Sequence, residues 1–178
     1  MVLFPREGES WRTRFYRAGI NVYPSYRGSG GRVTYIARDW LEVRMELPLG
    51  WRTRNNQGTI FGGSIYSAID PFYALMVAMN LGREYVVWDK AATIRYRRPG
   101  DAKLYGHFVL DREEIEGIRH EMQNRRSTDR VYTVRLVNRE GDVKAIIEKT
   151  VYVGWREGSP RAAVQPSERT LVSEKEAG

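Results

Sequence analysis

The sequence predicts an α+β domain in which an antiparallel sheet of about five strands wraps around one long central helix. The order of the segments is the first reason: one strand-like segment, one apolar helical run and four further strand-like segments follow one another. The helical run is the second reason, because Asp70 is its only charged residue between positions 60 and 81. A helix that is apolar nearly all round must be covered on most sides, and the sheet has to cover it.

The length of 178 residues and the 42% hydrophobic content are enough for one domain with a real core. Residues 1–32 form an arm ahead of the sheet, in which residues 11–17 have the pattern of a short amphipathic helix and a glycine cluster follows at 28–31. The main domain is expected over residues 33–155. Residues 156–178 contain prolines and mixed charges with little apolar content, which is typical of a flexible tail.

The first strand and the helix have clear sequence signals. Apolar and polar residues largely alternate over residues 33–47, which predicts a single half-buried strand that Pro48 ends. After a polar loop, the apolar run predicts a helix over residues 62–80, closed by Gly82. Pro71 should kink or interrupt this helix, because proline lacks an N–H and clashes with the preceding turn.

Four strand-like segments follow the helix, with turn signals between most of them. They are expected at residues 85–97, 103–110, 130–138 and 143–152. Pro99-Gly100-Asp101 separates the first two, and a turn at 139–142 joins the last two as a hairpin, so neighbouring strands should be antiparallel. Residues 113–124 are polar and fit either a short helix or an elaborated connection.

The formal net charge of +7 suits a nucleic acid or a phosphorylated small molecule such as coenzyme A as partner, and the arginine content also fits genome composition alone. The absence of cysteine excludes disulfides, thiolate nucleophiles and cysteine metal sites, and it favours a cytoplasmic location. The chain starts without a secretion-signal pattern, and its apolar run contains Asp, Pro and Asn. We therefore expect neither a secretion signal nor a membrane partner.

The lone carboxylate of Asp70 is the strongest catalytic candidate, because an ionised acid in an apolar interior is costly unless it is paired, hydrogen-bonded or used. Gly62 and Gly63 precede it by about two helical turns. At a helix start, bare N–H groups and the helix dipole can stabilise an oxyanion. Asp70 beside Pro71 also fits a residue that satisfies backbone groups at a helix break, and the glycines also fit a close approach of helix and sheet or of two subunits.

Other catalytic chemistries fit this sequence less well. Ser64 lacks the final glycine of the G-x-S-x-G elbow that holds a nucleophilic serine. The two histidines, His107 and His120, are thirteen residues apart and have no metal-ligand spacing. We therefore expect no metal site and no redox cofactor.

A spaced motif carries a resemblance to a known family. The phrase N-x-x-G-x-x-x-G-G-x-x-x-x-x-x-D, formed by Asn55, Gly58, Gly62, Gly63 and Asp70, resembles that of the hotdog-fold acyl-CoA thioesterases of the phenylacetyl-CoA type. The resemblance spans roughly residues 33–153. The wider text, including Gly58-Thr59-Ile60-Phe61-Gly62-Gly63, Asp70-Pro71 and Val87-Trp88-Asp89-Lys90, is similar to a bacterial branch of hotdog proteins described as tetrameric acyl-CoA thioesterase-like.

The resemblance implies hydrolysis of an acyl-CoA thioester to free acid and coenzyme A, with no cofactor beyond the coenzyme A of the substrate. The family's general base or nucleophile matches Asp70, and its oxyanion donor, the glycine after a histidine, matches Gly62, with Gly63 beside it. The asparagine that places water or substrate matches Asn55, for which an ordinary turn residue is the alternative. Phe61 stands where the family usually has the histidine, so the role of the imidazole must be filled otherwise or not at all.

The resemblance also implies how the site is assembled. Hotdog sites lie at subunit interfaces, so we expect a homodimer or homotetramer in which Asp70 of one chain faces residues 55–63 of the other. Asn56, Gly58 and Phe61 would then contact the substrate. Two other functions remain open: a non-catalytic binder of acyl-CoA or a related acyl ligand, and a basic nucleic-acid-binding protein.

Four cations are candidates for the coenzyme end of the substrate: Lys90, Arg95, Arg97 and Arg98. Strict alternation along the strand puts Arg95 and Arg97 on one face, and Lys90 and Arg98 on the other. They could not then all contact one ligand, and a solvated strand edge or a subunit interface is the alternative.

Overall fold

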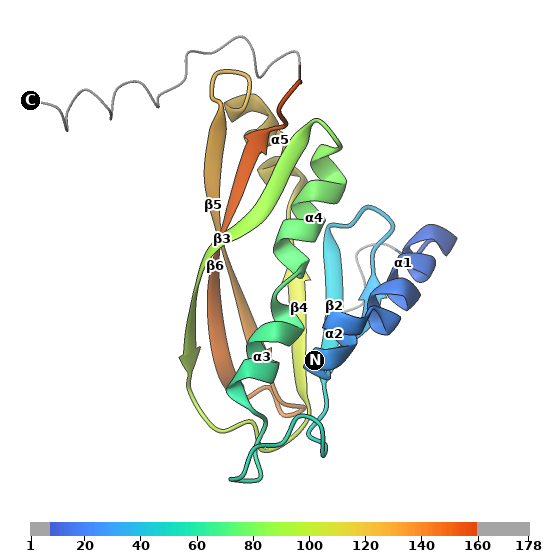
Figure 1. Ribbon diagram of the computed structural model, residues 1–178, viewed down its shortest axis with the longest axis vertical. Helices are drawn as coiled ribbons and strands as arrows, with labels where there is room; N and C mark the ends of the chain where they lie inside the picture. The colour runs from blue at the N-terminus through green and yellow to red at the C-terminus, as the bar shows by residue number, and fades with distance from the viewer. Residues whose placement is uncertain (1–7, 160–178) are drawn as a thin grey trace, which may run out of the picture.

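The computed structural model describes residues 8–159, which form one antiparallel sheet and five helices within that range (Figure 1). The strands are β1 (Arg32–Ile36), β2 (Glu42–Leu47), β3 (Tyr85–Tyr96), β4 (Leu104–Val109), β5 (Ser127–Val137) and β6 (Val143–Trp155). Their order across the sheet is β1-β2-β4-β5-β6-β3. The helices are α1 (Trp11–Val22), α2 (Pro24–Ser29), α3 (Gly62–Ile69), α4 (Phe72–Leu81) and α5 (Arg112–Glu121).

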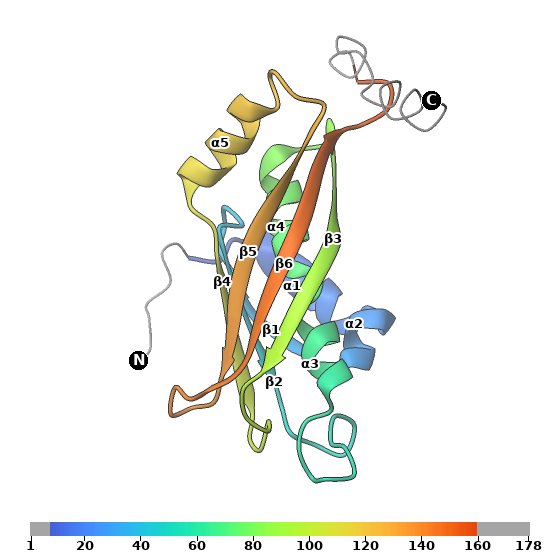
Figure 2. The ribbon, with the colours of Figure 1, turned by 90° about the vertical axis from the view of Figure 1, so that its left-hand side faces the viewer.

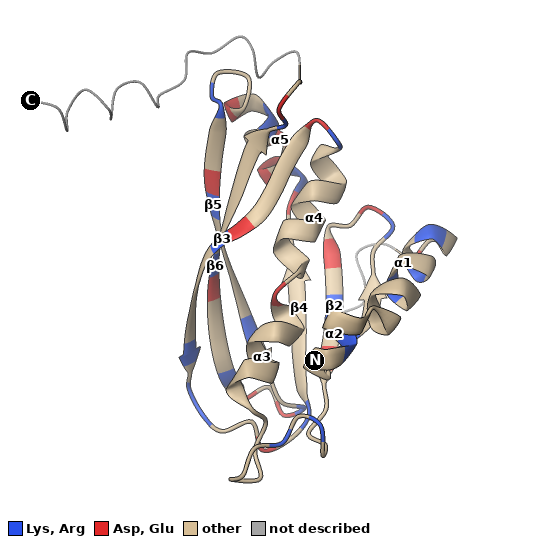
Figure 3. Cartoon of the chain, in the orientation of Figure 1, with Lys and Arg blue, Asp and Glu red and all other residues tan. Residues whose placement is uncertain are grey.

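The central helices α3 and α4 run along one face of the twisted sheet, and this confirms the predicted α+β architecture (Figures 1 and 2). Phe72 of α4 is fully buried, and its ring centroid lies 4.8 Å from that of Phe108 in β4 and 5.7 Å from that of Tyr26 in α2. The apolar helix is therefore enclosed by the sheet on one side and by α2 on another. Figure 3 shows few charged residues along α3 and α4.

The sheet has six strands rather than about five, because residues 33–47 form a hairpin and not one strand. Trp40 lies in the turn with a φ of 59°, a left-handed conformation that a straight strand does not contain. The N–H of Ala37 donates to the carbonyl of Glu42 at 2.9 Å and closes the turn. The Trp40 side chain is nevertheless buried, which offsets the cost of its backbone conformation.

The predicted interruption of the central helix is confirmed. α3 ends at Ile69 and α4 begins at Phe72, so Asp70 and Pro71 form the break. The other end of α4 is followed by Gly82, whose φ is 98°. The break places Asp70 at the C-terminal end of an eight-residue helix rather than in the middle of a long one.

The ambiguous segment at residues 113–124 contains a helix, α5. Glu113 and Glu114 lie in its first turn and Arg119 and His120 in its last, so the charges complement the helix dipole at both ends. In the arm at residues 1–32, the structure describes two helices, α1 and α2, where the sequence indicated one short helix. Most of the tail expected at 156–178 lies outside the described residues.

Among residues 8–159, no helix combines the length and the apolar character that crossing a bilayer requires.

Candidate active site

The start of α3 presents backbone N–H groups that no side chain caps. Phe61 is the N-cap residue, with an extended backbone and no capping hydrogen bond from its side chain. The first helical N–H groups have no partner within a helix, so those of Gly62 and Gly63 are available to a ligand. Two contacts hold this turn in place: the Phe61 N–H donates to the Thr53 carbonyl at 2.7 Å, and the Tyr96 hydroxyl donates to the Gly62 carbonyl at 3.1 Å.

Both glycines lie close to aromatic side chains. A Cβ on Gly62 would lie 2.9 Å from the Tyr96 hydroxyl oxygen, and a Cβ on Gly63 would lie 2.4 Å from the Phe61 ring. The side chain of Phe61 is more than half exposed. The helix start is therefore an exposed aromatic residue followed by bare backbone.

The sequence predicted that Asp70 lies in an apolar interior, and this prediction is wrong. Its side chain, at the helix break, is 46% exposed in this chain. Its partner is Lys149 of β6, whose side chain has no exposed surface. The ammonium of Lys149 donates to the backbone carbonyl of Asp70 and lies 3.3 Å from its Oδ1.

A second carboxylate, Asp89 of β3, completes this cluster. Its Oδ2 accepts a hydrogen bond from the Lys149 ammonium at 2.5 Å, whereas its Oδ1 is buried without a hydrogen-bond partner. Burial raises the pKa of Asp89 above its ordinary value of 3.8, against the opposing effect of Lys149. The ring of Tyr66 lies 5.7 Å from the ammonium. Burial, with a hydrogen bond to Asp70, raises the pKa of Tyr66 to about 12.

Lys149 and Asp89 were not identified as site residues from the sequence. Lys149 pairs with Asp70 and with Asp89 across 79 and 60 positions of chain, and a local sequence motif does not contain such long-range contacts. A signal for Lys149 does exist in its own strand. Alternate residues Ala145, Ile147, Val151 and Val153 are fully buried, so a lysine at position 149 must face the interior and needs a buried anion.

The side chain of Asn55 forms hydrogen bonds within its own loop. Its Oδ1 accepts from the N–H groups of Gln57 and Thr59 at 2.9 and 3.1 Å, and its Nδ2 donates to the Thr59 hydroxyl at 3.0 Å. This geometry fits the alternative of a turn residue, and it shapes the loop that leads to α3. Asn56 is exposed in the same loop, and Gly58 has a φ of 80° that favours glycine.

The two halves of the expected site do not meet within one chain. Gly62 and Asp70 lie at opposite ends of α3, eight residues apart, which corresponds to about 12 Å along a helix. A water held by Asp70 could not reach a thioester whose oxygen rests on Gly62 of the same chain. Catalysis by both groups on one substrate therefore needs a second copy of the protein.

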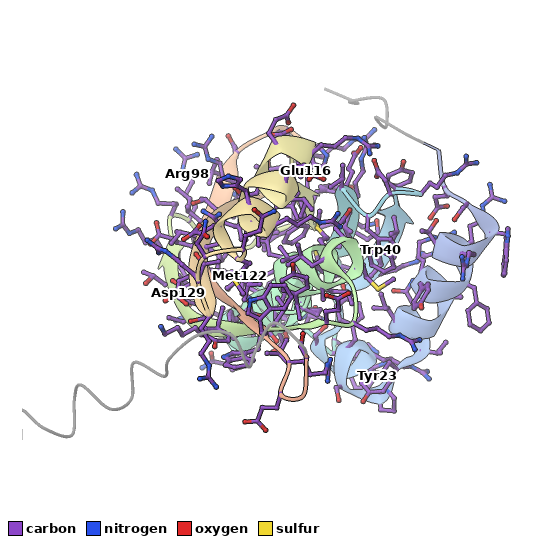
Figure 4. All side chains as sticks on the ribbon, turned by 90° about the horizontal axis from the view of Figure 1, so that it is seen from above. Tyr23, Trp40, Arg98, Glu116, Met122 and Asp129 are labelled. Atoms are coloured by element: carbon purple, nitrogen blue, oxygen red, sulfur yellow. The ribbon has the colours of Figure 1, made fainter. Side chains whose placement is uncertain are left out.

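The predicted faces of the cations are partly wrong. β3 has a bulge between Asp89 and Ala91, which shifts the alternation by one residue. Lys90 forms an ion pair with Asp129 at 2.6 Å on the outer face of the sheet, and Arg95 lies on this same face, because it pairs in register with Ile146. Figure 4 shows Arg98 and Asp129 on one side of the molecule, with Tyr23 on the other.

Two arginine-lined depressions lie on the surface, and one of them adjoins the loop that leads to α3. One, of about 460 Å³, is lined by Arg97, Arg98 and Arg135 and also by Asp142. Arg97 and Arg98 directly follow Tyr96 in the sequence. The other, of about 450 Å³, is lined by Arg27, Arg32, Trp51, Arg52 and Thr53, and no carboxylate lines it. The carbonyl of Thr53 accepts the hydrogen bond from Phe61, so this second depression adjoins the helix start directly.

Within residues 8–159, no group of three or more His, Asp or Glu residues is arranged to hold a metal ion.

The sequence matches the family described as "Domain of unknown function (DUF4442)" over residues 12–153. It has no significant match among curated proteins. The fold is similar to that of PA5026 from Pseudomonas aeruginosa, a protein of unknown function described as a probable thioesterase, with a TM-score of 0.70 and 18% identity over 85% of this chain and 100% of that one.

Two further solved structures share the fold. The thioesterase HI1161 from Haemophilus influenzae has a TM-score of 0.61 and 13% identity, over 84% of this chain and 94% of that one. The PaaI protein of the phenylacetic acid degradation operon from E. coli has a TM-score of 0.56 and 16% identity, over 84% and 94%. The similarities confirm the hotdog fold that the sequence motif indicated.

We predict that Lys149→Met lowers the free energy of unfolding by about 3–5 kcal/mol, because it leaves Asp89 and Asp70 facing each other without their shared cation. Lys90→Met is the matched control. It removes an exposed ion pair, which contributes at most about 1 kcal/mol. Urea unfolding followed by circular dichroism measures both, and equal losses for the two variants would contradict a structural role of the buried ammonium.

Proposed function

This chain belongs to the DUF4442 family, and we propose that it hydrolyses an acyl-CoA thioester to a free acid and coenzyme A. The observation that carries the proposal is the make-up of α3, which begins with uncapped N–H groups at Gly62 and Gly63 and ends at the half-exposed carboxylate of Asp70. The occurrence of this fold in proteins described as thioesterases supports it.

The reaction needs one base and one oxyanion site. Asp70 takes a proton from a water molecule whose oxygen bonds to the thioester carbonyl carbon, and the carbonyl oxygen becomes an oxyanion that accepts from the Gly62 and Gly63 N–H groups. When the carbonyl re-forms, the carbon–sulfur bond breaks, and the proton on Asp70 passes to the leaving sulfur. The products are a carboxylic acid and the coenzyme A thiol.

The proposal requires a homodimer or a larger homo-oligomer, because the two ends of α3 in one chain lie too far apart to serve one thioester. β3 supports such an assembly: it is a twelve-residue strand at one edge of the sheet, so one side of its backbone is free to pair. A two-fold contact would bring Asp70 of one chain toward residues 55–63 of its partner.

The phosphates of coenzyme A would lie in an arginine-lined depression beside the helix start. The depression at Arg27, Arg32 and Arg52 is the better candidate, because no carboxylate lines it and Trp51 offers an exposed indole for stacking on the adenine. Arg98 in the other depression lies 3.9 Å from Asp142, and Arg32 here lies 3.8 Å from Glu46, so the preference depends on the lining residues and on Trp51.

Asp70→Asn should lower kcat/KM for acyl-CoA by about 10²–10⁴-fold, because it keeps the size of the side chain and removes the base. The measurement is free-thiol release over a panel of acyl-CoAs. Asp129→Asn is the control, since Asp129 is a comparably exposed aspartate on the outer face of the sheet and should keep the wild-type rate. Unchanged kcat/KM in Asp70→Asn would leave Asp70 as a helix-break residue only.

The coenzyme site is tested with paired arginine variants. Arg27→Gln/Arg52→Gln should raise KM for acyl-CoA about tenfold or more with little change in kcat, whereas Arg97→Gln/Arg98→Gln should change KM less. Acyl-pantetheine, which lacks the nucleotide, should respond to neither pair. The opposite order of the two pairs would place the phosphates in the depression lined by Arg97 and Arg98.

The alternative function is a non-catalytic acyl-CoA binder, and Phe61 is the observation that favours it. A phenyl ring cannot exchange protons or donate a conventional hydrogen bond, so the wild-type pH–rate profile should lack the descending limb that a catalytic imidazole would add. We expect Phe61→His to alter turnover without unfolding the protein. If only Phe61→His hydrolyses acyl-CoA and the wild type merely binds it, the natural protein is a binder.

A further inference from the structure

The first helix, α1, is attached to the domain by polar contacts and by two apolar side chains, Tyr16, whose ring packs edge-on against that of Trp40, and Ile20, which packs against the core. At its start, Ser10 and Thr13 form a reciprocal capping box, and Thr13 is buried. In its middle, the Arg17 guanidinium donates to Glu9 at 2.8 Å. At its end, Asn21 exchanges two hydrogen bonds with the backbone of Val33 in β1. The side of α1 that faces the protein therefore combines polar contacts with a small apolar part.

The opposite side of α1 is apolar and faces outward. Trp11, Phe15 and Val22 are 78%, 75% and 67% exposed, and their spacing of four and seven residues places them along one side of the helix. Tyr23, at the end of the helix, is also exposed and lies at the rim of the molecule, on the side away from Arg98 and Asp129 (Figure 4). We call these four residues the aromatic stripe. A surface helix normally has the reverse arrangement, with its apolar side toward the core.

The charge around the aromatic stripe is positive. Arg12 and Arg14 are exposed between its residues, and the Arg12 guanidinium lies 5.9 Å from the centre of the Trp11 ring. Among residues 8–31, Glu9 is the only acid, and it is mostly buried against Arg17. The stripe thus combines exposed aromatic side chains with arginines and has no exposed carboxylate of its own.

We propose that the aromatic stripe of α1 binds the surface of a lipid bilayer that contains anionic headgroups. Tryptophan, phenylalanine and tyrosine are the residues that enter the interfacial region of a bilayer, and neighbouring arginines pair with its phosphates. A second copy of the chain fits this surface less well. In a two-fold contact centred on the stripe, Arg12 and Arg14 would face their own copies, and the acid beside them, Glu9, is already shared between Arg14 and Arg17.

The proposal replaces our expectation from the sequence that no membrane takes part. That expectation considered only spanning segments and secretion signals, whereas the stripe would lie on a bilayer without crossing it. The four residues of the stripe line neither arginine-lined depression, although Asn21 of α1 lines the one at Arg27 and Arg52. Binding to a bilayer does not depend on whether the protein hydrolyses thioesters.

The test is sedimentation of the full chain with vesicles. Phosphatidylcholine vesicles that contain phosphatidylglycerol in equal part should carry the wild type down, and added salt should reduce this, whereas vesicles of phosphatidylcholine alone should bind much less. Trp11→Ser/Phe15→Ser should weaken binding to the anionic vesicles about tenfold or more. Trp88→Ser/Val131→Ser removes two apolar side chains, 49% and 60% exposed, from the outer face of the sheet and should bind as the wild type does.

A second pair of variants tests the charge and leaves the apolar residues in place. Arg12→Gln/Arg14→Gln should weaken binding by about fivefold for each arginine, and Arg126→Gln/Arg139→Gln, which removes two exposed arginines elsewhere, should not. Absence of binding to anionic vesicles, or equal effects of the α1 and control pairs, would overturn the proposal. If the wild type ignores vesicles and Trp11→Ser/Phe15→Ser lowers the oligomer mass by light scattering, the stripe contacts a second copy instead.

Discussion

The ammonium of Lys149 is the interaction on which the arrangement of this domain depends. A fully buried cation is stable only where acceptors surround it, and here they come from the helix break at Asp70 and from Asp89 on β3. The break, the edge strand β3 and the inner strand β6 are therefore fixed relative to one another. Because Asp89 faces inward to reach the ammonium, the bulge that follows it, between Asp89 and Ala91, sets which face the later residues of β3 occupy.

Local signals in the sequence predicted most of the fold, and long-range contacts account for what they missed. The apolar run, Pro71 and Gly82 located α3 and α4 correctly, and alternation located the strands. The hairpin at Trp40 was missed because its apolar residues continue the alternation through the turn. The bulge in β3 was missed because it depends on pairing with β6, more than fifty residues away. The side chains of Lys90 and Arg95 therefore lie on the same face of the sheet, whereas strict alternation predicted opposite faces.

The candidate site, like the fold, was predicted from the sequence only in part. The sequence located the two ends of α3, and the structure places Gly62 and Gly63 at its start and Asp70 at its end. The sequence could not predict the surroundings of Asp70, because the burial of its carboxylate depends on the direction in which the helix break points the side chain. The carboxylate is half exposed beside a buried ammonium, so it is accessible to water and also held in position. A general base needs both properties, because it must lie within hydrogen-bond reach of the water before its pKa can matter.

The glycine pair at the start of α3 lies close to two exposed aromatic side chains. A side chain on Gly62 would meet the hydroxyl end of Tyr96, and one on Gly63 would meet the ring of Phe61. Both rings are more than half exposed and can move aside, so these contacts do not by themselves require glycine at either position. The stronger evidence for an oxyanion site is that the helix starts without a capping side chain, which leaves N–H donors unsatisfied beside an exposed aromatic ring. A fold that needed this turn only for packing would gain stability from a capping serine or aspartate at position 61, and phenylalanine gives none.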